Sequence, residues 1–201
     1  MALSISMDKL SVASLQEAVG GIKNGLVAVR TRAVNKTLTG AKTEAVAAVY
    51  MKLNLTKTRI RQDFYITKAT YTKPVGKLEA RGKPVGLISF SGTRPTLKGV
   101  SVLVRRDGVR TILRHAFIAT AKTAENVWWR EWSGPRQPKK PTVKYGRLPR
   151  DYRYDIHRLE GPRIEDILAD DTTMYEVMDR SAIRYRDNLD YELDRLLEKY
   201  K

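Results

Sequence analysis

The residues of this sequence that could carry chemistry are few and lie far apart. Neither of the two histidines, His115 and His157, has a second histidine or a cysteine at metal-ligand spacing. Asp155 and His157 come nearest to a metal pair, because alternate residues of an extended segment point to the same side. No third ligand is in view and the chain contains no cysteine, so we expect neither a metal site nor a disulfide. His115 lies in an apolar block, which favours a core or interface histidine.

Two further stretches resemble catalytic motifs but differ in detail. The segment from Gly76 to Pro84 has five residues between its glycines rather than four, and proline where a phosphate loop needs a hydroxyl. The segment from Ser89 to Gly92 lacks the leading glycine of a nucleophile elbow. The sequence therefore indicates a protein that is not an enzyme, and we expect no cofactor.

Positive charge is the dominant feature of the composition. The net charge is +16, with 29 Lys/Arg against 8 Asp/Glu in residues 1–150 and 9 against 14 in residues 151–201. This asymmetry favours nucleic acid or acidic protein as a neighbour of the first part, and an ordinary solvated face is the alternative. The candidate DNA-facing cations are Lys57, Arg59, Arg61, Arg105, Arg106 and Arg110.

The clearest sheet pattern runs over residues 85–119. Val100, Val102 and Val104 alternate with less apolar residues, which predicts a half-buried strand whose valines face the helices. Asp107-Gly108 predicts a tight hairpin turn with positive φ angles, followed by a return strand over 109–114. We expect this hairpin to be the central sheet, with shorter strands over 64–69 and 78–81.

Helical patterns precede the hairpin. Ser14 and Glu17 fit a capping box that starts an amphipathic helix, which Thr39-Gly40 is expected to break or bend. A second helix is predicted over 41–53, and Thr56 caps a short third helix over 57–63. A basic helix after a short turn also permits a helix-turn-helix interpretation, but its signal is weak. The stripe of the first helix consists of Leu15, Val19, Ile22, Leu26, Val29 and Ala33.

Two more helices are predicted after Gly161-Pro162. The first buries Ile164, Ile167 and Leu168, and a capping box at Thr173–Glu176 starts the second. The acidic residues of the last helix lie opposite its stripe, which indicates a solvated face or an ion-paired subunit contact. The stripe consists of Met178, Ala182, Tyr185, Leu189, Leu193, Leu196 and Tyr200, and the acidic residues are Asp187, Asp190, Asp194 and Glu198.

Residues 127–132 predict a last strand with aromatic side chains on both faces, suited to burial on both sides or to a partner subunit. The Pro- and Lys-rich segment 133–141 favours an extended, mobile loop. The candidate inter-subunit contacts are Trp128, Trp129, Trp132, Pro138, Lys139 and Lys140.

These patterns predict one α+β domain over residues 1–201, an antiparallel sheet packed against a long N-terminal helix and a C-terminal helix. The alternation of Leu3, Ile5 and Met7 with serines predicts a short first strand or an N-terminal arm within 1–10, and a mobile loop is expected at 133–144. The N-terminus lacks a signal peptide, and no apolar run approaches the ~18 residues of a membrane span. We therefore expect a soluble protein that is intracellular when made.

Several separated fragments of the sequence form an ordered series: residues 32–37, 87–90, 98–102, 116–119, Val127 with Arg130, 147–149, and Gly161-Pro162 with Ile164 and Leu168. In this order and approximate spacing they resemble the minor tail protein Z family of long-tailed bacteriophages and prophages. The resemblance covers about residues 25–200, and its weight lies in the ordered series rather than in any one fragment. The segment 126–145 is more elaborate, and the spacer 150–160 longer, than the family pattern.

The resemblance implies a structural virion protein with an α+β tail-completion fold. Family members complete the tail at its head-proximal end, as a hexameric ring between the tail terminator and the head connector or stopper. Viral DNA would pass through the lumen, which the candidate cations would face without reading sequence. The implied location is the tail or neck of the virion, assembled in the host bacterial cytoplasm, with no membrane partner. The alternative is a basic nucleic-acid-binding module without sequence specificity.

Overall fold

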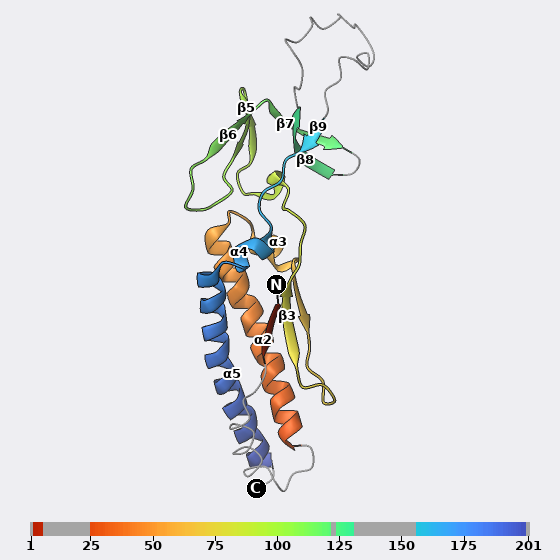
Figure 1. Ribbon diagram of the computed structural model, residues 1–201, viewed down its shortest axis with the longest axis vertical. Helices are drawn as coiled ribbons and strands as arrows, with labels where there is room; N and C mark the ends of the chain where they lie inside the picture. The colour runs from red at the N-terminus through yellow and green to blue at the C-terminus, as the bar shows by residue number, and fades with distance from the viewer. Residues whose placement is uncertain (1, 6–24, 122–123, 131–155, 200–201) are drawn as a thin grey trace, which may run out of the picture. The chain divides into compact units, whose positions relative to one another are not determined.

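The computed structural model describes residues 2–5, 25–121, 124–130 and 156–199 (Figure 1). The chain divides into two compact units, the first made of residues 1–83 and 162–201 and the second of residues 84–161. The second unit is thus an insertion in the sequence of the first. The predicted α+β class is confirmed, since two long helices and antiparallel sheets are both present. The sequence did not indicate the division into two units.

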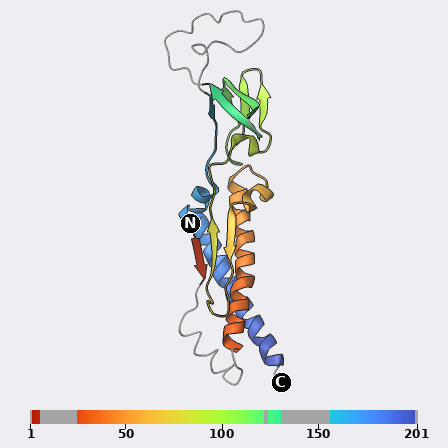
Figure 2. The ribbon, with the colours of Figure 1, turned by 90° about the vertical axis from the view of Figure 1, so that its right-hand side faces the viewer.

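Two long helices, α2 (Gly25–Lys52) and α5 (Asp171–Lys199), lie side by side and antiparallel in the first unit (Figures 1 and 2). Polar contacts join them along their length. Lys52 Nζ lies 2.7 Å from Asp170 Oδ2 at the start of α5, and Glu44 pairs with Arg184. Further along, Asn188 donates to Thr37 Oγ1 at 3.0 Å. The partners run in opposite directions along the two helices, as an antiparallel pair requires.

The predicted break of the first helix at Thr39-Gly40 is wrong, because α2 continues through it. Thr39 Oγ1 donates to the Asn35 carbonyl at 3.1 Å, a local bond that a helix accommodates. Gly40 leaves room for the Arg184 side chain, which a Cβ at this position would overlap. The glycine therefore permits close helix packing rather than ending the helix. Residues 14–24, with the predicted capping box, lie outside the described part.

Helix α5 begins earlier than predicted, and its first half turns a different face inward, whereas Tyr185 and Leu189 of the predicted stripe are buried as expected. Its first turn is capped by Asp170, whose Oδ2 accepts from the Thr173 backbone N–H at 3.4 Å and from the Thr173 hydroxyl at 3.0 Å. The capping box at Thr173 is therefore wrong by three residues. In its first half the helix buries Val177 and Ser181, whereas the expected Met178 is 50% exposed. The Ser181 hydroxyl donates to the Val177 carbonyl at 2.6 Å, so this small polar residue fits the interface.

A three-stranded antiparallel sheet with the order β1-β3-β2 packs against α2. Its strands are β1 (Ala2–Ile5), β2 (Phe64–Thr67) and β3 (Gly76–Ala80). Leu78 lies opposite Ile66, and a Cβ on Gly76 would overlap Leu38 of α2. The absence of a side chain at Gly76 thus lets the strand approach the helix. On the other face, Glu79 is paired with both Lys77 and Arg81.

Two short helices complete the first unit. Helix α3 (Lys57–Arg61) is capped by Thr56, whose hydroxyl accepts from the Arg59 N–H at 3.3 Å, as predicted. Helix α4 (Ile164–Leu168) buries Ile164, Ile167 and Leu168, also as predicted, although it begins two residues after Pro162.

The second unit holds two three-stranded antiparallel sheets, β4-β5-β6 and β7-β8-β9, and a 3-10 turn, η1 (Leu87–Ser89). Backbone bonds from Gly161 N to the Val85 carbonyl (2.7 Å) and from Leu87 N to the Leu159 carbonyl (3.2 Å) close the unit where the chain enters and leaves it. The strands are β4 (Arg94–Thr96), β5 (Gly99–Val102), β6 (Thr111–Arg114), β7 (Ala116–Ala121), β8 (Ala124–Arg130) and β9 (Ile156–Arg158).

The predicted hairpin over 100–114 exists, with Val100 opposite Leu113, but its expected place and turn are wrong. Val100 and Val102 are buried in the core of the second unit, and the sheet against the long helices is β1-β3-β2 instead. Residues 103–110 connect the strands as a longer loop, in which the Gly108 N–H donates to the Arg105 carbonyl at 3.3 Å. Asp107 and Gly108 both lack a positive φ, because a loop of this length does not require the mirror-image turn.

Two further expectations change in the second unit. His115 is exposed, so the core role is wrong, whereas the interface role stays a prediction. Its φ of 62° turns the chain between β6 and β7. The strand with the tryptophans is not the last, because β9 pairs with it, Trp129 lying opposite His157.

Candidate functional site

The outer face of sheet β4-β5-β6 gathers arginines from strands that the sequence places apart. Directly paired residues of antiparallel strands share a face. Ser101 lies opposite both Arg94 and Ile112, and Arg114 is two residues beyond Ile112 on the same strand. All of these except Ser101 are exposed. We call the surface formed by Arg94, Arg110, Ile112 and Arg114 the arginine face.

Arg110 is held on this face by the loop before β4. Its Nη1 donates to the Gly92 carbonyl at 2.7 Å and lies 3.5 Å from Ser101 Oγ. Gly92 has a φ of +74°, and a Cβ there would lie 2.9 Å from Arg110 Nη2. The glycine therefore serves both the backbone conformation and the close approach of the guanidinium. The arrangement fixes one cation over the sheet while leaving it exposed.

Arg105 and Arg106 lie in the connection that also holds Arg110, so the structure brings these three predicted residues into one loop. Arg105 is exposed and its carbonyl closes the turn with Gly108. Sequence reasoning did not include Arg94 among the cations, because the pairing of β4 with β5 gives no local signal beyond the Gly92–Pro95 turn residues.

The other predicted cations lie on α3, in the first unit. Arg59 Nη1 is 2.8 Å from Oδ1 of Asp63, four residues later in the chain. Its charge is therefore compensated by a local ion pair. Lys57 Nζ lies 5.1 Å from the centre of the Tyr50 ring. Arg61 is exposed. The helix thus presents fewer available cations than its sequence suggests.

The two described tryptophans differ in exposure. Trp128 is half-buried, and its indole N–H donates to the Ala119 carbonyl across the sheet at 2.9 Å. Trp129 is 37% exposed, which leaves it available for contact. The remaining candidate contacts, Trp132, Pro138, Lys139 and Lys140, lie outside the described residues, as do the loop 133–144 and most of the arm 1–10.

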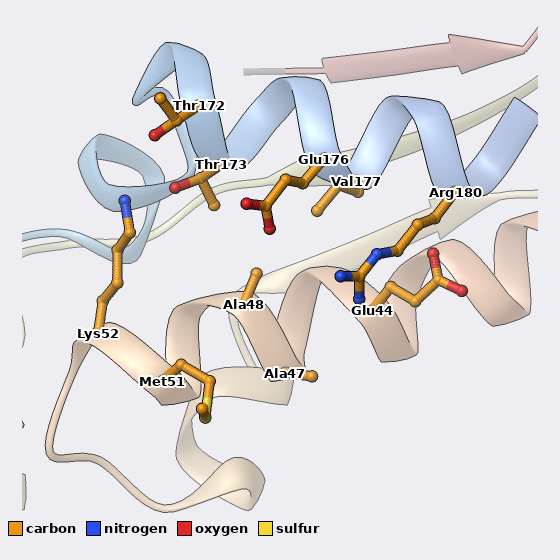
Figure 3. Close-up of a pocket in the computed structure, with 10 residues that line it drawn as sticks. All are labelled: Glu44, Ala47, Ala48, Met51, Lys52, Thr172, Thr173, Glu176, Val177 and Arg180. Carbon is orange, nitrogen blue, oxygen red and sulfur yellow. The ribbon is translucent and has the colours of Figure 1, made fainter.

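A hollow of about 410 Å³ lies between the second half of α2 and the first half of α5 (Figure 3). Its lining includes Ala47, Ala48, Met51 and Val177, with charged side chains around them. The Thr172 and Thr173 hydroxyls on its wall both donate to Asp170, so they are occupied by the helix cap. The charged lining residues are Glu44, Lys52, Glu176 and Arg180. The lining suits a hydrophobic side chain with a charged border better than acid–base chemistry.

Glu192 is a buried carboxylate that the sequence analysis did not select. It is 1% exposed, with Lys36 Nζ 2.5 Å from Oε1 and the guanidinium groups of Arg32 and Arg195 within 3.9 Å of Oε2. Its position three residues after Leu189, on the apolar side of α5, was the available signal. Three surrounding cations offset the cost of burying one charge, so the cluster is best explained as a polar tie between the two helices.

Within residues 2–5, 25–121, 124–130 and 156–199, no group of three or more His, Asp or Glu side chains is placed to hold a metal ion. None of the helices described is long and apolar enough to cross a bilayer.

No protein-family model matches the sequence, and neither a curated protein nor a solved structure shows detectable similarity to it.

Proposed function

We propose that this chain is a structural virion protein of a long-tailed bacteriophage or prophage. In this role it completes the tail at its head-proximal end, as a ring that joins the tail terminator to the head connector or stopper. The ring would surround the DNA path, and the subunit would act by binding its neighbours rather than by catalysis. The resemblance to the minor tail protein Z family and the α+β fold both support this role.

The observation that carries the proposal is the arginine face. It is an open sheet surface on which three arginines surround the exposed Ile112. Such a surface suits contact with a second macromolecular surface, because small-molecule sites are concave. A subunit that works through its surfaces needs this kind of feature.

The fragments behind the resemblance also have structural positions that explain them. Phe90 is 1% exposed, and a Cβ added to Gly161 would lie 2.8 Å from its ring. These two residues come from opposite ends of the second unit and meet where the chain enters and leaves it. Val100 and Val127, from two other fragments, are fully buried in the same unit. These members of four fragments therefore pack inside the second unit, as a shared fold would require.

The test is electron microscopy of particles of the encoding phage made without this protein. We expect heads and tails that are complete but not joined, and restoration when the protein is supplied from a plasmid. Supplying an Arg94→Glu, Arg114→Glu variant should restore joining poorly, whereas Lys68→Glu, Lys73→Glu, with the same charge change on exposed residues of the first unit, should restore it. Normally joined particles without the protein would refute the proposal.

A basic nucleic-acid-binding module is the second candidate, favoured by the exposed Arg61 and Arg105. It predicts sub-micromolar binding to duplex DNA that weakens steeply with salt. Neutralising Lys57 and Arg61 should reduce the affinity, and neutralising Arg59 should matter less because that side chain pairs with Asp63. Weak binding that these changes leave unaltered would exclude this function.

A further inference from the structure

We infer that an exposed row of residues on α5 binds the arginine face of a second copy of this chain. The inference rests on the proposed function for the identity of the neighbour, since a ring places identical subunits side by side. It goes further by naming the two surfaces that meet. Neither surface belongs to the hollow between α2 and α5.

The row on α5 follows from the spacing of its buried face. Five residues at intervals of four are all buried: Thr173, Val177, Ser181, Tyr185 and Leu189. Residues two positions later lie about 200° further around the helix, which is nearly the opposite side. We call this second row the α5 ridge; it consists of Tyr175, Asp179, Ile183, Asp187 and Tyr191.

The α5 ridge alternates exposed apolar or aromatic residues with aspartates. Tyr175 is 73% exposed, Ile183 55% and Tyr191 58%. The ring of Tyr191 also has Lys36 Nζ 4.2 Å from its centre, so this end of the ridge is anchored to α2. An apolar or aromatic residue recurs every eight positions on this row with an aspartate between, so the row offers a partner both apolar contact and negative charge.

The charge of α5 is opposite to that of the chain. The helix holds eight Asp/Glu against five Lys/Arg, although the whole chain has a net charge of +16. Around the α5 ridge, the exposed residues Asp190, Asp194 and Glu198 add to the acidic side. The exposed basic residues beside it are Arg180, Arg184 and Arg186, of which Arg184 is paired with Glu44 of α2. DNA would be repelled by this surface. Its partner must instead be basic and must offer an apolar residue between the cations.

The arginine face has the complementary order. Arg110, Ile112 and Arg114 follow one another on one side of an extended segment, about 6.7 Å apart. Asp179, Ile183 and Asp187 follow one another on the α5 ridge about 6 Å apart. Over three residues, the spacing along the arginine face and the spacing along the α5 ridge are nearly equal. Each arginine can therefore pair with an aspartate while the isoleucines pack together. The arginine face therefore fits the α5 ridge better than it fits a phosphate backbone, which offers nothing to Ile112.

Contacts between two different surfaces of identical subunits are head-to-tail. Such contacts close into a ring or continue as a filament, depending on the rotation between subunits. The α5 ridge belongs to the first unit and the arginine face to the second, so each copy offers one surface of each kind.

The test uses two charge-reversal variants of the full chain, studied by sedimentation velocity. One carries Asp179→Lys and Asp187→Lys. The other carries Arg94→Glu and Arg114→Glu, which leave the Arg110 bond to Gly92 intact. We expect the wild type to self-associate and each variant alone to associate at least about tenfold more weakly. An equimolar mixture of the two variants should associate again, because each altered surface then meets a partner of opposite charge.

The controls separate this contact from misfolding and from general charge effects. Circular dichroism of each variant should match the wild type, and recovery in the mixture independently requires that both are folded. Glu125→Lys with Asp166→Lys makes the same charge change at exposed residues outside α5 and should leave association unchanged. A contact within one chain would not be recovered by mixing, so a mixture that stays monomeric overturns the inference.

Two other results would also overturn it. A wild type that stays monomeric at all concentrations lacks the contact. The other result concerns the Arg94→Glu, Arg114→Glu variant. If this variant loses binding to duplex DNA but still self-associates, the arginine face binds phosphate instead. Neither result would disprove the proposed function, which is decided by whether particles lacking the protein are joined.

Discussion

Replacing Gly92 with alanine tests how the arginine face is built. Gly92 has a φ of +74°, a conformation that costs an L-residue about 1–2 kcal/mol. The new Cβ would also lie 2.9 Å from Arg110 Nη2, which would have to move away from the Gly92 carbonyl. We therefore expect Gly92→Ala to lower the free energy of unfolding of the second unit by about 1–2 kcal/mol, and to weaken self-association.

Gly108→Ala is the matched control, because it is the same change in another loop beside the same sheet. Gly108 has no positive φ, and the nearest atom to its added Cβ would be Arg105 Cβ at 3.4 Å. This substitution should be neutral or stabilise the unit by up to about 1 kcal/mol, through the lower entropy of the unfolded chain. Urea unfolding followed by tryptophan fluorescence reports on this unit, because Trp128, Trp129 and Trp132 all belong to residues 84–161.

The contribution of the guanidinium can be separated from that of the backbone. In an Arg110→Ala background the Cβ at position 92 has no arginine side chain beside it. Gly92→Ala should then lower the free energy of unfolding only by the cost of the positive φ. Gly92→Asn should cost less than Gly92→Ala, since asparagine tolerates this φ better. Equal effects of Gly92→Ala and Gly108→Ala would refute the reasoning, because the two sites would then not differ in conformation or space.

Three further changes address the first unit. Gly76→Ala should destabilise the first unit by about 1–3 kcal/mol, because the Cβ would overlap Leu38 and lie 2.9 Å from Val34 Cγ1. Urea unfolding followed by circular dichroism measures this change. A neutral result would contradict the packing of β3 on α2. Hydrogen bonds from Lys52, Thr172 and Thr173 hold the pKa of Asp170 well below its usual range. Its stabilising contribution should therefore be complete above a pH of about 4 and be lost as the pH falls below that value, and Asp170→Asn should flatten this part of the stability–pH curve; an unchanged curve would argue against the cap. Burial raises the pKa of Tyr185, whose buried hydroxyl has no hydrogen-bond partner among the residues that the structure describes. Tyr185→Phe should leave stability unchanged or increase it, and a loss above about 1 kcal/mol would reveal a partner.

The elements with strong local patterns could be predicted from the sequence. The spacing over 41–53 predicts an inward face of Ala45, Val46, Val49, Tyr50 and Leu53; four of these are buried and Tyr50 is half-buried. Thr56 caps α3 as predicted. Errors arose where a residue's role depends on a neighbour from a distant part of the chain. Gly40 reads locally as a helix breaker, but the approach of Arg184 explains it.

The division into two units illustrates the same limit at a larger scale. Its boundaries fall between Lys83 and Pro84 and between Gly161 and Pro162, at turn residues that the sequence marks clearly. What the sequence does not mark is that these two places belong together. That pairing depends on backbone bonds such as Gly161 N to Val85 O, for which any residues of suitable conformation would serve. The arginine face could not be predicted from the sequence for the same reason. Arg94 belongs to it only because β4 pairs with β5, and this pairing has no local sequence signal.

The net charge of +16 opposes association between copies, so the proposed contact must overcome a general repulsion. At physiological salt, charges more than about 8 Å apart are largely screened, whereas groups in contact are not. The outcome therefore depends on which charges meet at the interface rather than on the total. The two reversal variants separate these effects: Asp179→Lys, Asp187→Lys raises the net charge, and Arg94→Glu, Arg114→Glu lowers it. If total charge governed association, Arg94→Glu, Arg114→Glu would associate more strongly than the wild type. If the α5 ridge binds the arginine face, each variant alone associates more weakly than the wild type, and only the mixture of the two recovers association.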